Sequence, residues 1–169
     1  MEVFEAIRTV LATRSYQPKP LPAESVGRIL QAAHLTASSM NKQPWYFILV
    51  DERTDLQQLG CLARTGPYVA EAGAAVAVAI ENTRYAVSDA SRAIQSMILT
   101  AWSDGIASNW VGFFGLEKVE ELLEIPDDLR LLAVVAFGYD NRTKVVGRKK
   151  RKPFSEVVYH GRFGQPFGG

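Results

Sequence analysis

Apolar residues recur along the chain at two spacings, and these spacings predict where it forms helices and where it forms strands. Spacings of three and four residues are typical of helices that bury one face. They occur in five segments, residues 2–12, about 23–35, 53–64, 89–103 and 116–123. Ser88 or Asp89 is expected to cap the fourth of these helices, and Gly105 is expected to end it.

Short, continuous apolar runs predict strands at residues 46–50, 74–80 and 131–137. The second run is wholly apolar, as in strands that are covered on both faces. Residues 109–113 predict a short strand or a loop. Because helices and strands interleave, we expect a layered sheet protein with helices on both faces. A length of 169 residues predicts a single domain over residues 1–169.

The fourth predicted helix is apolar around nearly its whole circumference between residues 93 and 102. Such a helix is either central within its own chain or buried by a partner. The tail, residues 159–169, carries three aromatic side chains and has little to pack against. We expect this tail either to wrap around a partner subunit or to be disordered.

Composition and charge exclude several classes of protein. The chain is 47% hydrophobic and 22% charged, as in globular proteins, and its net charge of +1 argues against a general nucleic-acid binder. No apolar run approaches the roughly 20 residues that a membrane span needs. Glu2 and Glu5 stand in an N-terminus without a long apolar core, so no signal peptide is expected. We therefore expect a cytoplasmic protein without membrane or nucleic-acid partners.

Cysteine and histidine are scarce, which restricts the kinds of site that the chain can form. The single Cys61 excludes an internal disulfide framework and a cysteine-based metal cluster. We expect Cys61 in the core, on the apolar side of its helix. The two histidines, His34 and His160, are too few for a usual zinc site, so no metal site is expected.

Residues 38–45 form the most distinctive polar segment. Two hydroxyls, two carboxamides and an indole lie within eight residues, between a predicted helix and a predicted strand. The segment has many donors and acceptors but no obvious nucleophile, acid or base, which suits a planar heteroaromatic ligand. Ser, Asn and Pro are also common turn residues, so an ordinary helix-to-strand turn is the alternative.

A run of five cations, residues 148–152, is the second candidate site. Such a run is a solvated segment, a phosphate site or a nucleic-acid patch. It lies between a predicted strand and a short apolar segment, so it can be held against the fold. Arginine suits bidentate phosphate contacts, and lysine adds a point charge. Arg14, just after the first predicted helix, is a third candidate.

Taken together, these segments resemble the nitroreductase family of FMN-dependent oxidoreductases. Residues 29–33 leading into residues 38–45 carry the strongest resemblance. Further matches, in the same order along the chain, are residues 1–7, 14–22, 105–112, 122–126, 134–139 and 151–158. The resemblance implies an α+β fold of three layers, in which a mixed, mainly antiparallel sheet is flanked by helices. It also implies an intertwined homodimer with FMN at the interface.

The resemblance implies two groups of flavin contacts in the first half of the chain. Arg14 would lie near the pyrimidine ring or the ribityl chain, where a cation stabilises the negative charge of the reduced ring. Ser38, Ser39 and Asn41 would line the flavin, with Asn41 hydrogen-bonding the ring system. In this family the serine loop often reaches the flavin of the partner subunit.

The remaining implied contacts come from the second half of the chain. Val111 and Gly112 would pass the reactive edge of the ring and offer backbone groups near N5 and O4. Lys149 and Arg151 would hold the phosphate. Family members commonly carry an Arg and a Ser where residues 10–13 of this chain read Val-Leu-Ala-Thr. Either Arg148 or Lys150 replaces the missing phosphate contact, or FMN binds weakly.

The implied reaction is hydride transfer from NADH or NADPH to flavin N5, and then to a nitroaromatic, a quinone or a related small acceptor. FMN carries this chemistry while the protein positions it, so no catalytic side chain is expected. Donor and acceptor would use one pocket in turn, in a ping-pong cycle. The alternative is a non-catalytic protein that binds or sequesters FMN.

Overall fold

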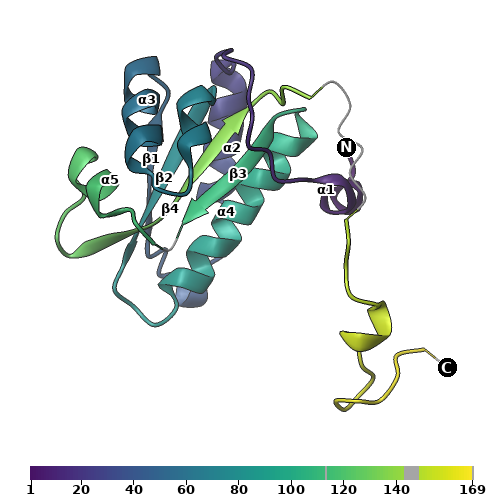
Figure 1. Ribbon diagram of the computed structural model, residues 1–169. Helices are drawn as coiled ribbons and strands as arrows, with labels where there is room; N and C mark the ends of the chain where they lie inside the picture. Colours follow the sequence, from purple (N-terminus) through teal and green to yellow (C-terminus); the bar gives the residue numbers. More distant parts are fainter. Residues whose placement is uncertain (113, 143–148, 169) are drawn as a thin grey trace.

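The structure is a computed structural model that describes residues 1–112, 114–142 and 149–168. Within the described residues, four antiparallel strands form one sheet in the order β1-β2-β4-β3 (Figure 1). The strands are β1 Trp45–Val50, β2 Ala74–Glu81, β3 Ala107–Gly112 and β4 Leu129–Gly138. The two central strands, β2 and β4, are buried along nearly their whole length. This burial explains why their sequences are continuously apolar rather than alternating, apart from Glu81 at the end of β2 and Arg130 near the start of β4.

Helices cover both faces of the sheet, as the interleaved pattern predicts (Figure 1). The helices are α1 Val3–Thr9, α2 Ala23–His34, α3 Arg53–Leu62, α4 Ala86–Ser103 and α5 Glu117–Leu122. Three short 3₁₀ turns are η1 Ser39–Asn41, η2 Pro67–Glu71 and η3 Phe154–Glu156. Helices α2 and α4 pack on one face, and α3, α5 and η2 pack on the other.

Two cores therefore lie back to back across the sheet. Adjacent residues of a strand point to opposite faces, so Val134 enters the core under α3 while Val135 enters the core under α4. Small alanines along β2 and β4 let helices approach the sheet closely. Because α2 and α4 pack against each other and on the same face, they form a firm support for the segments that join them to the strands.

The first helix is shorter than predicted. It ends at Thr9 rather than at residue 12, because Val10 adopts an extended conformation. The chain then runs beside the exposed edge of β3, where Ala12 forms a parallel bridge with Ser108. The Thr13 amide donates to the Ser108 carbonyl at 3.0 Å. The apolar spacing predicts that residues 10–12 form helical hydrogen bonds. Residues 12 and 13 instead form backbone hydrogen bonds with the edge strand β3.

The fourth helix is longer at its N-terminus than predicted. It starts at Ala86, so Asp89 lies inside the first turn and neither Asp89 nor Ser88 is the N-cap residue. The carboxylate of Asp89 is instead bonded to Ser39 in the loop before β1. The predicted C-terminal end is confirmed, since Gly105 follows the helix with φ of 76°, in the left-handed region that glycine adopts without a steric penalty.

Two other predictions change with the structure. Cys61 is exposed rather than buried, because the buried stripe of α3 runs through Leu56, Leu59 and Gly60. The ambiguous segment 109–113 is a strand as far as Gly112, and Phe113 lies outside the described residues. Among the described residues, no helix is long and apolar enough to cross a membrane.

The C-terminal segment leaves the body of the molecule (Figure 1). It contains η3 and a small turn in which Tyr159 and Pro166 form an isolated bridge. Its aromatic side chains contact one another, with the rings of Tyr159 and Phe163 centred 4.6 Å apart. Phe163 is nevertheless 89% exposed, so this segment has no core of its own.

Candidate functional site

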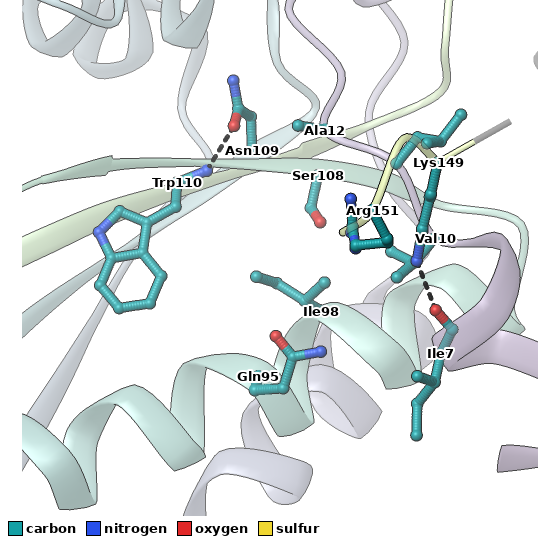
Figure 2. A pocket seen from close by; sticks show the side chains of 11 residues that line it. Ile7, Val10, Ala12, Gln95, Ile98, Ser108, Asn109, Trp110, Lys149 and Arg151 are labelled. Atoms are coloured by element: carbon teal, nitrogen blue, oxygen red, sulfur yellow. Dashed lines mark hydrogen bonds between the residues drawn. The ribbon is translucent and has the colours of Figure 1, made fainter. Parts of the chain in front are cut away.

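A cleft of about 430 Å³ lies between β3 and α4 (Figure 2). Ser108 and Trp110 point into it from the strand, and Gln95 and Ile98 point toward it from the helix. The cleft is completed by Ile7, Val10, Leu11, Ala12, Asn109, Lys149 and Arg151. It is therefore walled mainly by apolar side chains, with a few polar groups among them.

Two cations stand together at one end of the cleft. The Lys149 ammonium donates to the carbonyl of Ile7, near the C-terminal end of α1, and Arg151 donates to the carbonyl of Lys150 at 3.0 Å. Burial and the neighbouring Arg151 lower the pKa of Lys149 below its ordinary value. Two adjacent like charges that repel each other favour a bound anion, which would relieve the repulsion.

Apolar side chains lie beside these cations (Figure 2). Val10 and Ala12 line the cleft there, in the stretch that turns from α1 to the edge of β3. These are the positions where the sequence lacks an Arg and a Ser. Among the described residues, the cations that line the cleft are Lys149 and Arg151, and Arg148 lies outside the described residues.

Arg14 is exposed and does not line the cleft. It neighbours Tyr68, whose pKa is raised by burial and lowered in part by Arg14 and by Asn109. Asn109 also accepts a hydrogen bond from the Trp110 amide at 2.9 Å through its side-chain oxygen. Figure 2 shows Asn109 directed away from Ser108 and Trp110, so it links the cleft to the surroundings of Arg14.

A set of partly buried hydrogen bonds around Asp140, here called the clamp, holds the segment that carries Arg14. The Thr13 hydroxyl donates to Asp140 at 2.9 Å, and Arg142 donates to the same carboxylate at 2.8 Å. Burial acts to raise the pKa of Asp140, but the hydrogen bonds from Arg142 and Thr13 outweigh it and lower the pKa below its ordinary value. The clamp joins the end of β4 to the start of the chain beside β3.

Val111 and Gly112 end β3 with different roles. The Val111 side chain is buried in the core away from α4, where it packs closely against Gly66. A Cβ at Gly112 would lie 2.2 Å from Nε1 of Trp110, so glycine leaves room for the indole along this face of the strand. Backbone groups of residues 111–112 therefore lie next to an aromatic ring at the rim of the cleft.

The loop before β1 is separate from the cleft lining within one chain. Ser38 accepts a hydrogen bond from the Gln43 amide at 2.9 Å, and the Gln43 side chain donates to Asn41 at 3.3 Å. Ser39 is bonded to Asp89 on α4. None of Ser38, Ser39 and Asn41 lines the cleft. The structure thus brings together Lys149 and Arg151 in the cleft. The loop lies apart from them, near the N-terminal end of α4.

The model of the nitroreductase family matches residues 8–83 and 64–139. A protein of Methanothermobacter thermautotrophicus named "Putative NADH dehydrogenase/NAD(P)H nitroreductase" is 32% identical over 82% of this chain and 78% of its own length. The chain belongs to the nitroreductase family. The family predicted from the sequence is thereby confirmed.

Solved nitroreductase structures share the fold of this family member. The NfrA1 nitroreductase from B. subtilis has a TM-score of 0.85 and 25% identity, covering 96% of this chain and 75% of that chain. An FMN-dependent nitroreductase from Clostridium difficile R20291 has a TM-score of 0.83 and 22% identity, covering 95% of this chain and 99% of that one. The predicted α+β nitroreductase fold is confirmed, with a sheet whose four described strands are all antiparallel.

The prediction from the sequence of this nitroreductase-family chain did not include several residues of the cleft. Gln95, Ile98 and Ser108 line the cleft but stand in no recognisable motif. Gln95 gave one usable signal, because it is the largest polar side chain in the mainly apolar stretch between residues 93 and 102. In the described part of the chain, no group of three or more His, Cys, Asp or Glu side chains could hold a metal ion.

Proposed function

We propose that the protein binds FMN in the cleft between β3 and α4 and transfers hydride from NADH or NADPH to a small acceptor. The observation that carries this proposal is the pairing of an amphipathic, mainly apolar cleft with Lys149 and Arg151 at one end. Apolar walls suit a planar ring system, and paired cations suit a phosphate. The chemistry of the lining thus fits FMN.

The proposed roles of the residues follow from their positions. Lys149 and Arg151 hold the phosphate, while Gln95 and Ser108 offer hydrogen bonds inside the cleft. Backbone groups of residues 111–112 approach the reactive edge of the ring. When bound, FMN supplies a two-electron carrier that accepts hydride at N5.

Arg14 provides electrostatic support near the pyrimidine ring or the ribityl chain. The Thr13–Asp140 hydrogen bond keeps its segment beside β3, and Tyr68 and Asn109 lie near its side chain. A cation held in this way stabilises negative charge that develops on a neighbouring ring.

We propose that donor and acceptor occupy one open pocket in turn, in a ping-pong cycle. The described residues that line the cleft include no Asp, Glu, His or Cys. The protein therefore contributes binding, orientation and charge, and no side chain of the lining acts as an acid or base. Nitroaromatics, quinones and related small acceptors fit such a site.

We also propose a homodimer with FMN at the interface. The loop with Ser38, Ser39 and Asn41 stays outside the cleft of its own chain, so it is available to a partner's flavin. Apolar side chains on α1 support an interface, since Val3 and Phe4 are more than two-thirds exposed. The aromatic tail, with exposed Phe163, wraps the partner subunit.

Turnover with purified protein tests the proposal. The protein is saturated with FMN, freed of unbound flavin, and mixed with NADH or NADPH and a panel of quinones and nitroaromatics. We expect nucleotide oxidation that depends on the acceptor, with parallel double-reciprocal plots. Bound FMN without turnover would favour a flavin-sequestering protein, and failure to take up FMN would reject the cleft as a flavin site.

A further inference from the structure

The loop before β1 contains three residues whose backbone conformations are unfavourable unless neighbouring groups stabilise them. Met40, Asn41 and Gln43 have φ values of 52°, 54° and 51°, and none of them is glycine. Left-handed conformations are disfavoured for residues with a Cβ atom. Three within four residues persist only where the surrounding structure fixes them, and such clusters are typical of ligand clamps.

Asp89 supplies that fixation. It is one of the buried polar residues of the protein, with 0% of its surface exposed. Its carboxylate accepts a hydrogen bond from the Ser39 amide at 2.9 Å and another from the Ser39 hydroxyl at 2.9 Å. Arg92, one turn later on α4, forms an ion pair with it. A buried carboxylate with three donors is costly to break, because a lost donor leaves buried charge unpaired.

The protonation state of Asp89 agrees with this arrangement. Burial acts to raise its pKa, but the hydrogen bonds from Ser39 and Arg92 outweigh burial and lower the pKa below its ordinary value. The group is therefore a carboxylate at neutral pH, able to accept all three bonds. Asp89 does not cap α4, so these bonds account for its position in the first turn of the helix.

Helix α4 connects the loop to the cleft. Arg92 and Gln95 are three residues apart and share one face of the helix, and Gln95 lines the cleft. Arg92 also donates to the Ser39 hydroxyl at 3.5 Å. The loop is therefore attached through Asp89 and Arg92, about one to two helical turns before Gln95, on the element that forms the cleft wall.

We propose that Asp89 is a positioning residue for flavin binding. By holding the backbone of Ser39, it keeps the left-handed residues in place and presents Ser38 and Asn41 in a fixed geometry to the flavin of the partner subunit. Asp89 touches no ligand itself and acts through the loop. The proposal rests on the proposed function, and it adds a buried residue outside the cleft to those that determine flavin affinity.

Asp89→Asn tests the proposal, because asparagine keeps the size but cannot accept all three bonds. Thr36→Val is the matched control, since the Thr36 hydroxyl donates to Ser96 at 2.8 Å and also joins α4 to a neighbouring segment, without touching the loop. The measurements are the Kd for FMN by flavin fluorescence, the visible circular dichroism of bound FMN, and the melting temperature. Arg92→Met is a second variant for the case that Asp89→Asn does not fold. We expect it to fold, because the Arg92 side chain is half exposed.

We expect Asp89→Asn to raise the Kd for FMN about tenfold and to change the dichroism of the bound flavin. Arg92→Met should raise it about threefold. Thr36→Val should lower the melting temperature without changing either flavin property. If every folded variant at positions 89 and 92 binds FMN like the wild type, Asp89 has no positioning role and the proposed function stands. If wild-type protein takes up no FMN, both proposals fail.

Discussion

Replacing Arg151 with alanine tests whether the cationic end of the cleft holds a phosphate. Arg151 lines the cleft beside Lys149, and its guanidinium donates to the Lys150 carbonyl through one N–H group, which leaves its other N–H groups available to a ligand. Its loss should not unfold the protein, because the side chain is exposed. The substitution therefore isolates one ligand contact.

The expected magnitude follows from the type of bond. A charge-assisted hydrogen bond contributes about 1.5–3 kcal/mol. Because Arg151 is exposed and solvent screens its charge, the lower end of this range applies. At about 1.4 kcal/mol per factor of ten, Arg151→Ala should raise the Kd for FMN about tenfold. The assay is quenching of flavin fluorescence during titration with protein at about physiological ionic strength.

Lys152→Ala is the matched control for this measurement. It removes one cation from the same basic run, but Lys152 does not line the cleft. At about physiological ionic strength, screening should limit its effect on the Kd to less than about twofold. Equal effects of the two substitutions would refute the reasoning, since they would show that FMN senses only the summed charge of the run.

Three further predictions concern two glycine positions and a partly buried carboxylate. Gly60→Ala should cost about 1–3 kcal/mol of unfolding free energy in urea titrations, because its Cβ would lie 2.6 Å from the Ala70 amide nitrogen; unchanged stability would contradict this packing. Gly112→Ala should displace the Trp110 indole, shift tryptophan emission and weaken FMN binding, whereas unaltered emission and affinity would argue against the contact. The lowered pKa of Asp140 means that its stabilising contribution is present above the ordinary value of 3.8 and is lost as the pH falls further, through the folded-state pKa. Asp140→Asn should flatten that acid dependence, and a wild-type profile would oppose this assignment.

Much of the fold could be predicted because its signals are local. The apolar runs of β2 and β4 are buried by helices on both faces, and such runs are legible in sequence. The predictions for Cys61 and for the end of α1 were wrong because tertiary contacts decided them. Leu56 and Leu59 form the buried stripe of α3, which leaves Cys61 exposed. After Thr9 the chain forms backbone hydrogen bonds with the edge of β3 instead of continuing the helix.

The candidate site was only partly predictable for the same reason. Lys149 and Arg151 stood out as part of a basic run, and both line the cleft. Gln95 and Ser108 join them only because β3 and α4 lie side by side, which no local pattern reports. The partnership of Asp89 with Ser39 spans about fifty residues, so the sequence suggested the commoner role of a helix cap.

Anaerobic reduction of the FMN-loaded protein tests the central claim most directly. The visible absorbance of protein-bound flavin is recorded before and after addition of NADH or NADPH, without any acceptor present. Our account predicts that the bound flavin bleaches with one of these nucleotides, and that its colour returns when a quinone or nitroaromatic is added. Bound flavin that keeps its colour with both nucleotides would contradict the proposed oxidoreductase.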